Sequence, residues 1–281
     1  MQRLKHYSQL IRLDKPIGTL LLMWPMLIAL WVAGKGEPSV KNIFIFITGC
    51  FLMRSAGCAI NDFADRNIDG LVARTQNRPL ARGLITPIEA IGVFLVCIIF
   101  AFLLVWQTNW LTLQWSVLAV ILAFVYPFMK RYSYYPQFVL GAAFACAVPM
   151  AFAAQMNAVP PIAGLLYAAT LLWAVAYDTE YAMVDRDDDL KINVKSTAIL
   201  FGTWDRAFIF MAHITMLALL VFFGYYAQLG FIYYVSIALA LGLVLYQQKL
   251  IYERKAQDCF KAFLNNNKIG IILFLGVFFS Y

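Results

Sequence analysis

Long apolar runs separated by short polar connections make up most of this chain. Their approximate bounds are residues 19–33, 42–60, 90–108, 111–129, 137–156, 161–181, 206–228, 231–249 and 268–281. Most of them are close to the length that crosses the hydrocarbon core of a bilayer. Because lipid offers a backbone no hydrogen-bond partners, runs of this length and uniformity predict helices. We therefore expect an all-α integral membrane protein with about nine transmembrane helices.

The runs leave no room for a separate soluble domain. Of the 281 residues, 63% are hydrophobic and 13% are charged, whereas charged residues are about a quarter of a soluble domain. We expect one polytopic membrane domain over residues 1–281, with residues 1–17 as an amphipathic segment on the membrane surface. The start of the chain lacks the apolar region and cleavage site of a signal peptide, so we expect the first run to remain.

The distribution of charge and cysteine excludes two kinds of site. The net charge is +7, but the basic residues lie in the connections, mostly on one side if the runs alternate across a membrane. This asymmetry places the N-terminus and two aspartate-rich loops, near residues 61–89 and 178–205, in the cytoplasm, and it argues against nucleic-acid binding. The five cysteines are scattered without CxxC spacing, so we expect neither a disulfide framework nor a cysteine metal site.

The first acidic stretch, NDFADRNIDG, follows the second apolar run. On a helix, Asp62, Asp65 and Asp69 would lie at i, i+3 and i+7, which places all three carboxylates on one face. Like charges so placed repel each other, so we expect a positive ligand there, most simply a divalent metal ion. Arginines suited to phosphate oxygens follow. They are Arg66, Arg74, Arg78 and Arg82.

The second acidic stretch, YDTEYAMVDRDDDLKINVKS, repeats this combination. Asp178, Asp185 and Asp189 lie at i, i+7 and i+11, again on one helical face. The basic residues beside them are Arg186, Lys191 and Lys195. Carboxylates together with basic side chains suggest that the two stretches hold metal ions and a phosphate ligand between them.

These motifs are similar to those of the UbiA superfamily of membrane prenyltransferases. The patterns NDxxDxxxD and DxxxxxxDxxxD resemble the two aspartate-rich motifs of the superfamily. The segments DKPIGTLLLMWP, YPFMKRY and FKAFLNNN resemble its bacterial 4-hydroxybenzoate polyprenyltransferases, and this resemblance spans nearly the whole chain. It implies the UbiA-type prenyltransferase fold, with helices around a central cavity, in the bacterial cytoplasmic (inner) membrane.

The resemblance also implies the reaction and its substrates. A polyprenyl group passes from polyprenyl diphosphate to the ring of 4-hydroxybenzoate, ortho to the hydroxyl, with Mg²⁺ as the cofactor. The product, 3-polyprenyl-4-hydroxybenzoate, leads to ubiquinone biosynthesis. The other partner is the lipid bilayer, and the sequence leaves open the protein partners, the donor chain length and the oligomeric state.

Site residues carried over from the resemblance fall into three groups. The metal ligands are Asp62, Asp65, Asp69, Asp185 and Asp189. The residues implied in catalysis are Asp65, Asp69, Asp178, Asp185 and Asp189. The residues implied in substrate binding are Arg54, Asn61, Arg78, Tyr126 and Lys130, with Arg54 on the carboxylate of the acceptor.

Some alternatives stay open on the sequence alone. Arg54 lies within an apolar run, where a charge is costly unless paired, and it could form a buried ion pair with an aspartate instead of binding the acceptor. Asp178 could cap a helix or orient a lysine instead of contacting metal or acceptor. The acceptor could be a haem, a naphthoate, homogentisate or a lipid headgroup. Intramembrane charges are also found in transporters.

Overall fold

The computed structural model describes residues 2–281, and the regular structure in this range is helical, without strands. The α-helices are α1 (Gln2–Leu10), α2 (Ile17–Ala33), α3 (Val40–Asp65), α4 (Pro87–Val105), α5 (Trp110–Tyr132), α6 (Pro136–Ala145), α7 (Ala147–Met156), α8 (Pro161–Lys191), α9 (Thr197–Phe201), α10 (Asp205–Tyr226), α11 (Phe231–Leu250) and α12 (Ala256–Phe278). Short 3₁₀ helices are η1 (Asp69–Leu71), η2 (Gly202–Trp204) and η3 (Ile251–Glu253).

Seven helical segments in the described range are long and apolar enough to cross a membrane. They are α3, α4, α5, α6 with α7, α8, α9 with α10, and α11 with η3. The helix α2 is apolar but shorter, with 17 residues, and α12 has 23 residues but a polar first half. Each predicted apolar run therefore lies within a helix or a pair of helices, to within about three residues at its ends, and nine is an approximate count of the spans.

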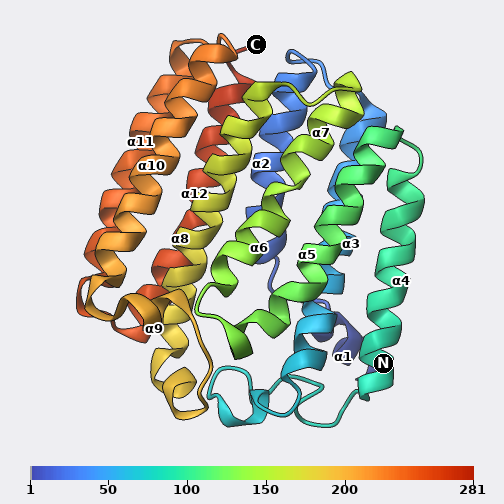
Figure 1. The fold of residues 1–281 in the computed structure, drawn as a ribbon, viewed down its shortest axis with the longest axis vertical. Coiled ribbons are helices and arrows are strands. Elements are labelled where there is room, and N and C mark those ends of the chain that lie inside the picture. The colour runs from blue at the N-terminus through green and yellow to red at the C-terminus, as the bar shows by residue number, and fades with distance from the viewer. Residues whose placement is uncertain (1) are drawn as a thin grey trace.

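The long helices stand side by side, and both acidic stretches lie at one end of the molecule (Figure 1). The N-terminus, the connection between α3 and α4, and the last turns of α8 share that end, while the C-terminus lies at the other (Figure 1). The helix α8 packs against α6, α10 and α12. This arrangement brings two motifs that are distant in the sequence to one region.

The core is built from large buried side chains that several helices contribute. Phe152, Phe223 and Leu273 are at most 1% exposed. Between helices in lipid, packing and small residues drive association more than the hydrophobic effect does. Gly270 of α12 illustrates this, because a Cβ there would lie 2.2 Å from Cδ1 of Trp24 in α2. The absent side chain lets the two helices approach closely.

Helix α12 begins well before the predicted start of the last run at residue 268. The polar asparagines before that position are inside the helix, and their side chains have partners in neighbouring helices. Trp24 Nε1 donates to Asn267 Oδ1 at 2.8 Å, and Trp173 Nε1 donates to Asn266 Oδ1 at 2.8 Å. These hydrogen bonds allow the asparagine amides to be buried between helices. The stretch can therefore be part of a packed helix, although its polar residues suggest a connection.

The loop expected near residues 178–205 is partly wrong, because the aspartates of the second acidic stretch lie on a helix, as their spacing on one helical face predicts. The helix α8 continues to Lys191, so Asp178, Asp185 and Asp189 belong to its last turns. No proline or glycine interrupts α8 after Gly164, so the helix can extend past the apolar run. By contrast, the run at 137–156 is divided into α6 and α7, near Pro149, which has no backbone N–H to donate to Ala145.

Candidate functional site

A cavity of about 1530 Å³ lies among the helices and includes the end of the molecule that carries both acidic stretches. Apolar side chains such as Met26, Phe46 and Met150 line its inner part. The catalytic, metal-binding and substrate-binding residues implied by the family resemblance all line this cavity. These residues are Arg54, Asn61, Asp62, Asp65, Asp69, Arg78, Tyr126, Lys130, Asp178, Asp185 and Asp189.

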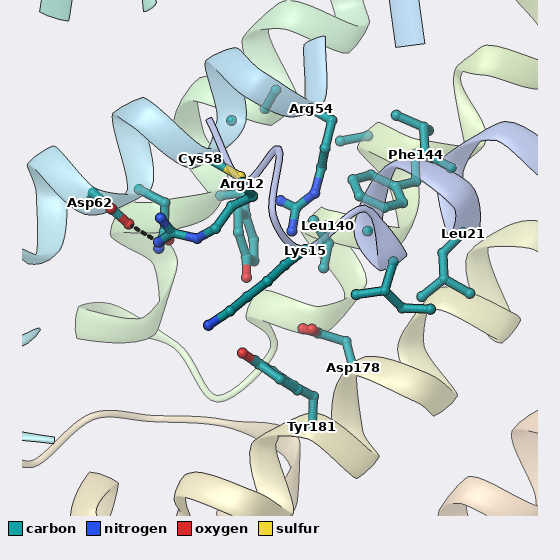
Figure 2. Close-up of a pocket in the computed structure, with 18 of the residues that line it drawn as sticks. Arg12, Lys15, Leu21, Arg54, Cys58, Asp62, Leu140, Phe144, Asp178 and Tyr181 are labelled. Carbon is teal, nitrogen blue, oxygen red and sulfur yellow. Dashed lines mark hydrogen bonds and ion pairs between the residues drawn. The ribbon is translucent and has the colours of Figure 1, made fainter. Parts of the chain in front are cut away.

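The last turn of α3 carries two buried carboxylates. Asp62 is 0% exposed and Asp65 is 2% exposed. Arg12 Nη2 lies 2.7 Å from Asp62 Oδ1, an ion pair that appears as a dashed line in Figure 2. Lys130, from the last turns of α5, forms an ion pair with Asp65. Segments far apart in the sequence therefore supply the charges that balance the first motif.

Asp69 does not continue the helix of Asp62 and Asp65, contrary to the expectation of one helical face. The helix α3 ends at Asp65, and Asp69 begins η1 after a turn. Arg78 nevertheless joins the group, because its Nη1 lies 2.8 Å from Asp69 Oδ2 and 3.1 Å from Asp62 Oδ1. Burial raises the pKa of Asp69, and the charge of Arg78 opposes that rise.

The second group of carboxylates comes from α8. Arg74 Nε donates to Asp185 Oδ1 at 2.9 Å, and its guanidinium lies over the ring of Tyr181, 4.5 Å from the centroid. The side chains of Asp178 and Asp189 have no hydrogen-bond or ion-pair partner within residues 2–281. Asp178 lies inside α8, so it does not cap a helix, and no described lysine pairs with it.

Arg54 is a cation without a counterion in the cavity. No carboxylate in residues 2–281 lies within ion-pair distance of its guanidinium, so the alternative of a buried ion pair is not found. Figure 2 shows the side chain extending from α3 into the space that Lys15 and Asp178 also face. An unpaired guanidinium in largely apolar surroundings favours an anionic ligand.

The carboxylates fit a hard cation that keeps some of its water. Asp62 Oδ2 and Asp65 Oδ1 are buried without a hydrogen-bond partner. Within the described part of the chain, no three acidic, histidine or cysteine side chains lie close enough together to hold a metal ion on their own. Mg²⁺ commonly takes only one or two carboxylates and completes its shell with water and substrate phosphates. The donor set is therefore of the kind that binds Mg²⁺ together with a phosphate ligand.

Several residues that line the cavity are not apparent from the sequence, and some arginines that the sequence suggests lie outside the cavity. Arg12, Lys15 and Tyr181 line the cavity, but Arg12 is 50 positions from its partner Asp62, a separation that no local spacing reveals. Among the arginines after the first motif, Arg66 and Arg82 are exposed and do not line the cavity. Arg12 lies in residues 1–17, which the sequence indicates only as an amphipathic segment.

Comparison with known proteins assigns the chain to a family. Residues 22–275 match the UbiA prenyltransferase family. The chain is 53% identical over 279 residues to the 4-hydroxybenzoate octaprenyltransferase of Citrobacter koseri, covering 99% of this chain and 96% of that protein. It is 55% identical over 271 residues to the 4-hydroxybenzoate octaprenyltransferase of Alkalilimnicola ehrlichii, covering 96% of this chain and 92% of that protein.

Solved structures show the same fold. A UbiA homolog from Aeropyrum pernix superposes with a TM-score of 0.81 at 24% identity, covering 92% of this chain and 96% of the other. A UbiA homolog from Archaeoglobus fulgidus bound to GPP and Mg²⁺ gives a TM-score of 0.79 at 19% identity, covering 98% of both chains. The expected UbiA-type helical fold is confirmed, and this multi-pass membrane protein belongs to the UbiA prenyltransferase family.

Proposed function

We propose that this protein transfers a polyprenyl group from polyprenyl diphosphate to the ring of 4-hydroxybenzoate, in a Mg²⁺-dependent reaction. The relatives that share more than half of its residues are named 4-hydroxybenzoate octaprenyltransferase. The observation that carries the proposal is the shared cavity. It combines two groups of carboxylates, several basic side chains and the unpaired Arg54.

The diphosphate binds where the two carboxylate groups face each other. Asp62, Asp65, Asp69, Asp185 and Asp189 are the residues that hold Mg²⁺, and Asn61 lies beside them. Bound Mg²⁺ supplies positive charge that stabilises the diphosphate as it leaves with the electron pair of the carbon–oxygen bond.

The basic side chains that form ion pairs with the carboxylates also bind the diphosphate. Arg78 pairs with Asp62 and Asp69, and Lys130 pairs with Asp65. We propose that these cations, together with the hydroxyl of Tyr126, turn to the phosphate oxygens when metal occupies the carboxylates. Positive groups at the leaving oxygens lower the barrier because the charge that develops there is stabilised without solvent reorganisation.

The acceptor binds deeper, beside Arg54. Its carboxylate pairs with the free guanidinium, which fixes the ring with its hydroxyl toward Asp178. The ring carbon ortho to the hydroxyl forms a bond to the first carbon of the prenyl chain, and the ring then loses the proton from that carbon. Asp178, with no other partner, orients the hydroxyl and accepts a proton from the acceptor.

The apolar part of the cavity suits the isoprenoid tail. Side chains of α4 and α5 line it, including Ile98, Val120 and Ile121, and Ile121 is 54% exposed. A tail that begins in this lining can continue into the bilayer. We further propose that the site faces the cytoplasm across the bacterial inner membrane, because the basic residues follow the positive-inside rule, and that the product enters ubiquinone biosynthesis.

The test is a transfer assay in membranes that contain the protein. Radiolabelled 4-hydroxybenzoate, octaprenyl diphosphate and Mg²⁺ are supplied, and a parallel sample receives a chelator. The proposal predicts label in the lipid-soluble fraction only when the metal is present. Absence of transfer by folded protein, with transfer to a naphthoate or homogentisate instead, would overturn the choice of acceptor.

A further inference from the structure

A buried ion-pair cluster lies beside the second acidic motif, outside the cavity. Its centre is Asp205, the first residue of α10, whose side chain is 0% exposed. Arg186 of α8 and Arg254, from the connection between η3 and α12, both pair with it. Arg254 approaches with two nitrogens, with Nη2 2.8 Å from Oδ1 and Nε 3.1 Å from each oxygen. We call Asp205, Arg186 and Arg254 the Asp205 cluster.

The Asp205 cluster joins four segments of the chain. Arg186 also donates to the carbonyl oxygen of Ala198 in α9, and Arg254 Nη2 donates to Thr203 O in η2 at 2.8 Å. The last turns of α8, the α9–η2 segment, the start of α10 and the connection before α12 therefore meet at one carboxylate. Several charge-assisted hydrogen bonds to one buried carboxylate restrict the positions of both guanidinium groups.

The position of Arg186 on α8 connects this cluster to the site. Arg186 directly follows Asp185, so its side chain leaves the helix about 100° around the axis from that carboxylate. Asp185 and Asp189 face the cavity on one side, and Arg186 is fixed to Asp205 on another. The body of α8 is held by its packing against α6, α10 and α12, and this ion pair adds a fixed contact at its last turns, where the directions of Asp185 and Asp189 are set.

We infer that Asp205 is a positioning residue, which sets the orientation of Asp185 and Asp189 toward the metal-bound diphosphate by holding Arg186. This inference rests on the proposed function, because it assumes that these two aspartates hold metal. Partners that hydrogen-bond directly to metal ligands change metal affinity by about 10- to 100-fold when they are replaced. Because Asp205 acts through Arg186, we expect an effect near the lower end of this range.

The test measures metal binding directly and does not depend on turnover. Mn²⁺ is titrated by electron paramagnetic resonance into the purified protein with an unreactive thio analogue of a polyprenyl diphosphate. Asp205→Asn keeps the shape of the side chain and removes its charge, and we expect it to weaken Mn²⁺ binding by about tenfold or more. Arg254→Gln leaves the pair of Arg186 and Asp205 in place, so we expect a smaller weakening of the same kind.

Tyr233→Phe is the matched control. Its hydroxyl donates to Leu220 O at 2.9 Å in a buried contact between α11 and α10, and Tyr233 does not line the cavity. This variant should bind Mn²⁺ like the wild type even where its unfolding temperature falls. Unchanged Mn²⁺ affinity in both cluster variants would overturn the inference, as would an equal loss in Tyr233→Phe. Absence of Mn²⁺ binding by the wild type would instead overturn the proposed metal site, and the inference with it.

If Asp205→Asn does not fold, the test uses Arg254→Gln and Arg254→Lys instead. Lysine cannot reproduce the two-nitrogen approach of Arg254 but keeps its charge. The inference predicts that Arg254→Lys binds Mn²⁺ more tightly than Arg254→Gln. Equal affinity in these two variants and the wild type would contradict it.

Discussion

Gly18 lies directly against the guanidinium of Arg54. A Cβ on Gly18 would lie 2.3 Å from Nε of Arg54, closer than non-bonded atoms approach each other. The first turn of α2 therefore gives the guanidinium its space, and the side chain of Arg54 extends past it into the cavity. Arg54 has no ion-pair partner in the described residues. The space beside Gly18 therefore determines where its unpaired guanidinium lies.

Gly18→Ala should weaken acceptor binding without unfolding the protein. The added methyl group meets only the far end of a flexible side chain, so Arg54 moves and the helix stays. We expect the KM for 4-hydroxybenzoate to rise about tenfold, the effect of roughly 1.4 kcal/mol, with the KM for the diphosphate unchanged. Steady-state kinetics with each substrate varied in turn measures both. An unchanged KM for the acid would mean that the Arg54 position does not matter.

Arg54→Ala should have a larger effect of the same kind. A hydrogen bond to a charged group contributes about 1.5–3 kcal/mol, so the KM for the acid should rise by about one to two powers of ten. For a neutral acceptor analogue that lacks the carboxylate, the KM should change little on this substitution, because the analogue makes no ion pair with Arg54. Equal increases in KM for acid and diphosphate would indicate a structural role for Arg54 instead.

Arg78→Lys tests whether a planar guanidinium is required at a position that contacts two carboxylates. Arg78 Nη1 reaches both Asp62 and Asp69, and a lysine ammonium keeps the charge but not the planar fork that suits phosphate. We expect weaker binding of the diphosphate, seen as a higher KM for that substrate, while the KM for 4-hydroxybenzoate changes little. Arg66→Lys is the control, because Arg66 is exposed and lies outside the cavity.

The cytoplasmic orientation of the site can be tested with introduced cysteines. The native cysteines are all buried, so they should contribute little background to labelling from water. In intact cells, a maleimide that does not cross the membrane should label Lys35→Cys, in the connection between α2 and α3, and should not label Arg82→Cys. After the membrane is opened, both should react. The reverse pattern in intact cells would invert the proposed topology.

Local patterns in the sequence predicted most of the spans and the carboxylates of the site. Apolar runs determine which segments enter lipid, and the spacing of Asp185 and Asp189 holds because α8 remains helical through them. Arg12 and the Asp205 cluster could not be predicted in this way, since both depend on contacts between distant segments. The start of α12 was missed because the partners of Asn266 and Asn267 are tryptophans of other helices.

The central claim is that the two carboxylate groups act together on one metal-bound diphosphate. The most direct test compares transfer of labelled 4-hydroxybenzoate by Asp65→Ala, Asp185→Ala and the double variant at saturating Mg²⁺, with folding checked by thermal unfolding. Because groups that act as a unit are strongly non-additive, each single variant should abolish transfer and the double variant should be no worse. Near-normal transfer by either single variant would contradict the claim.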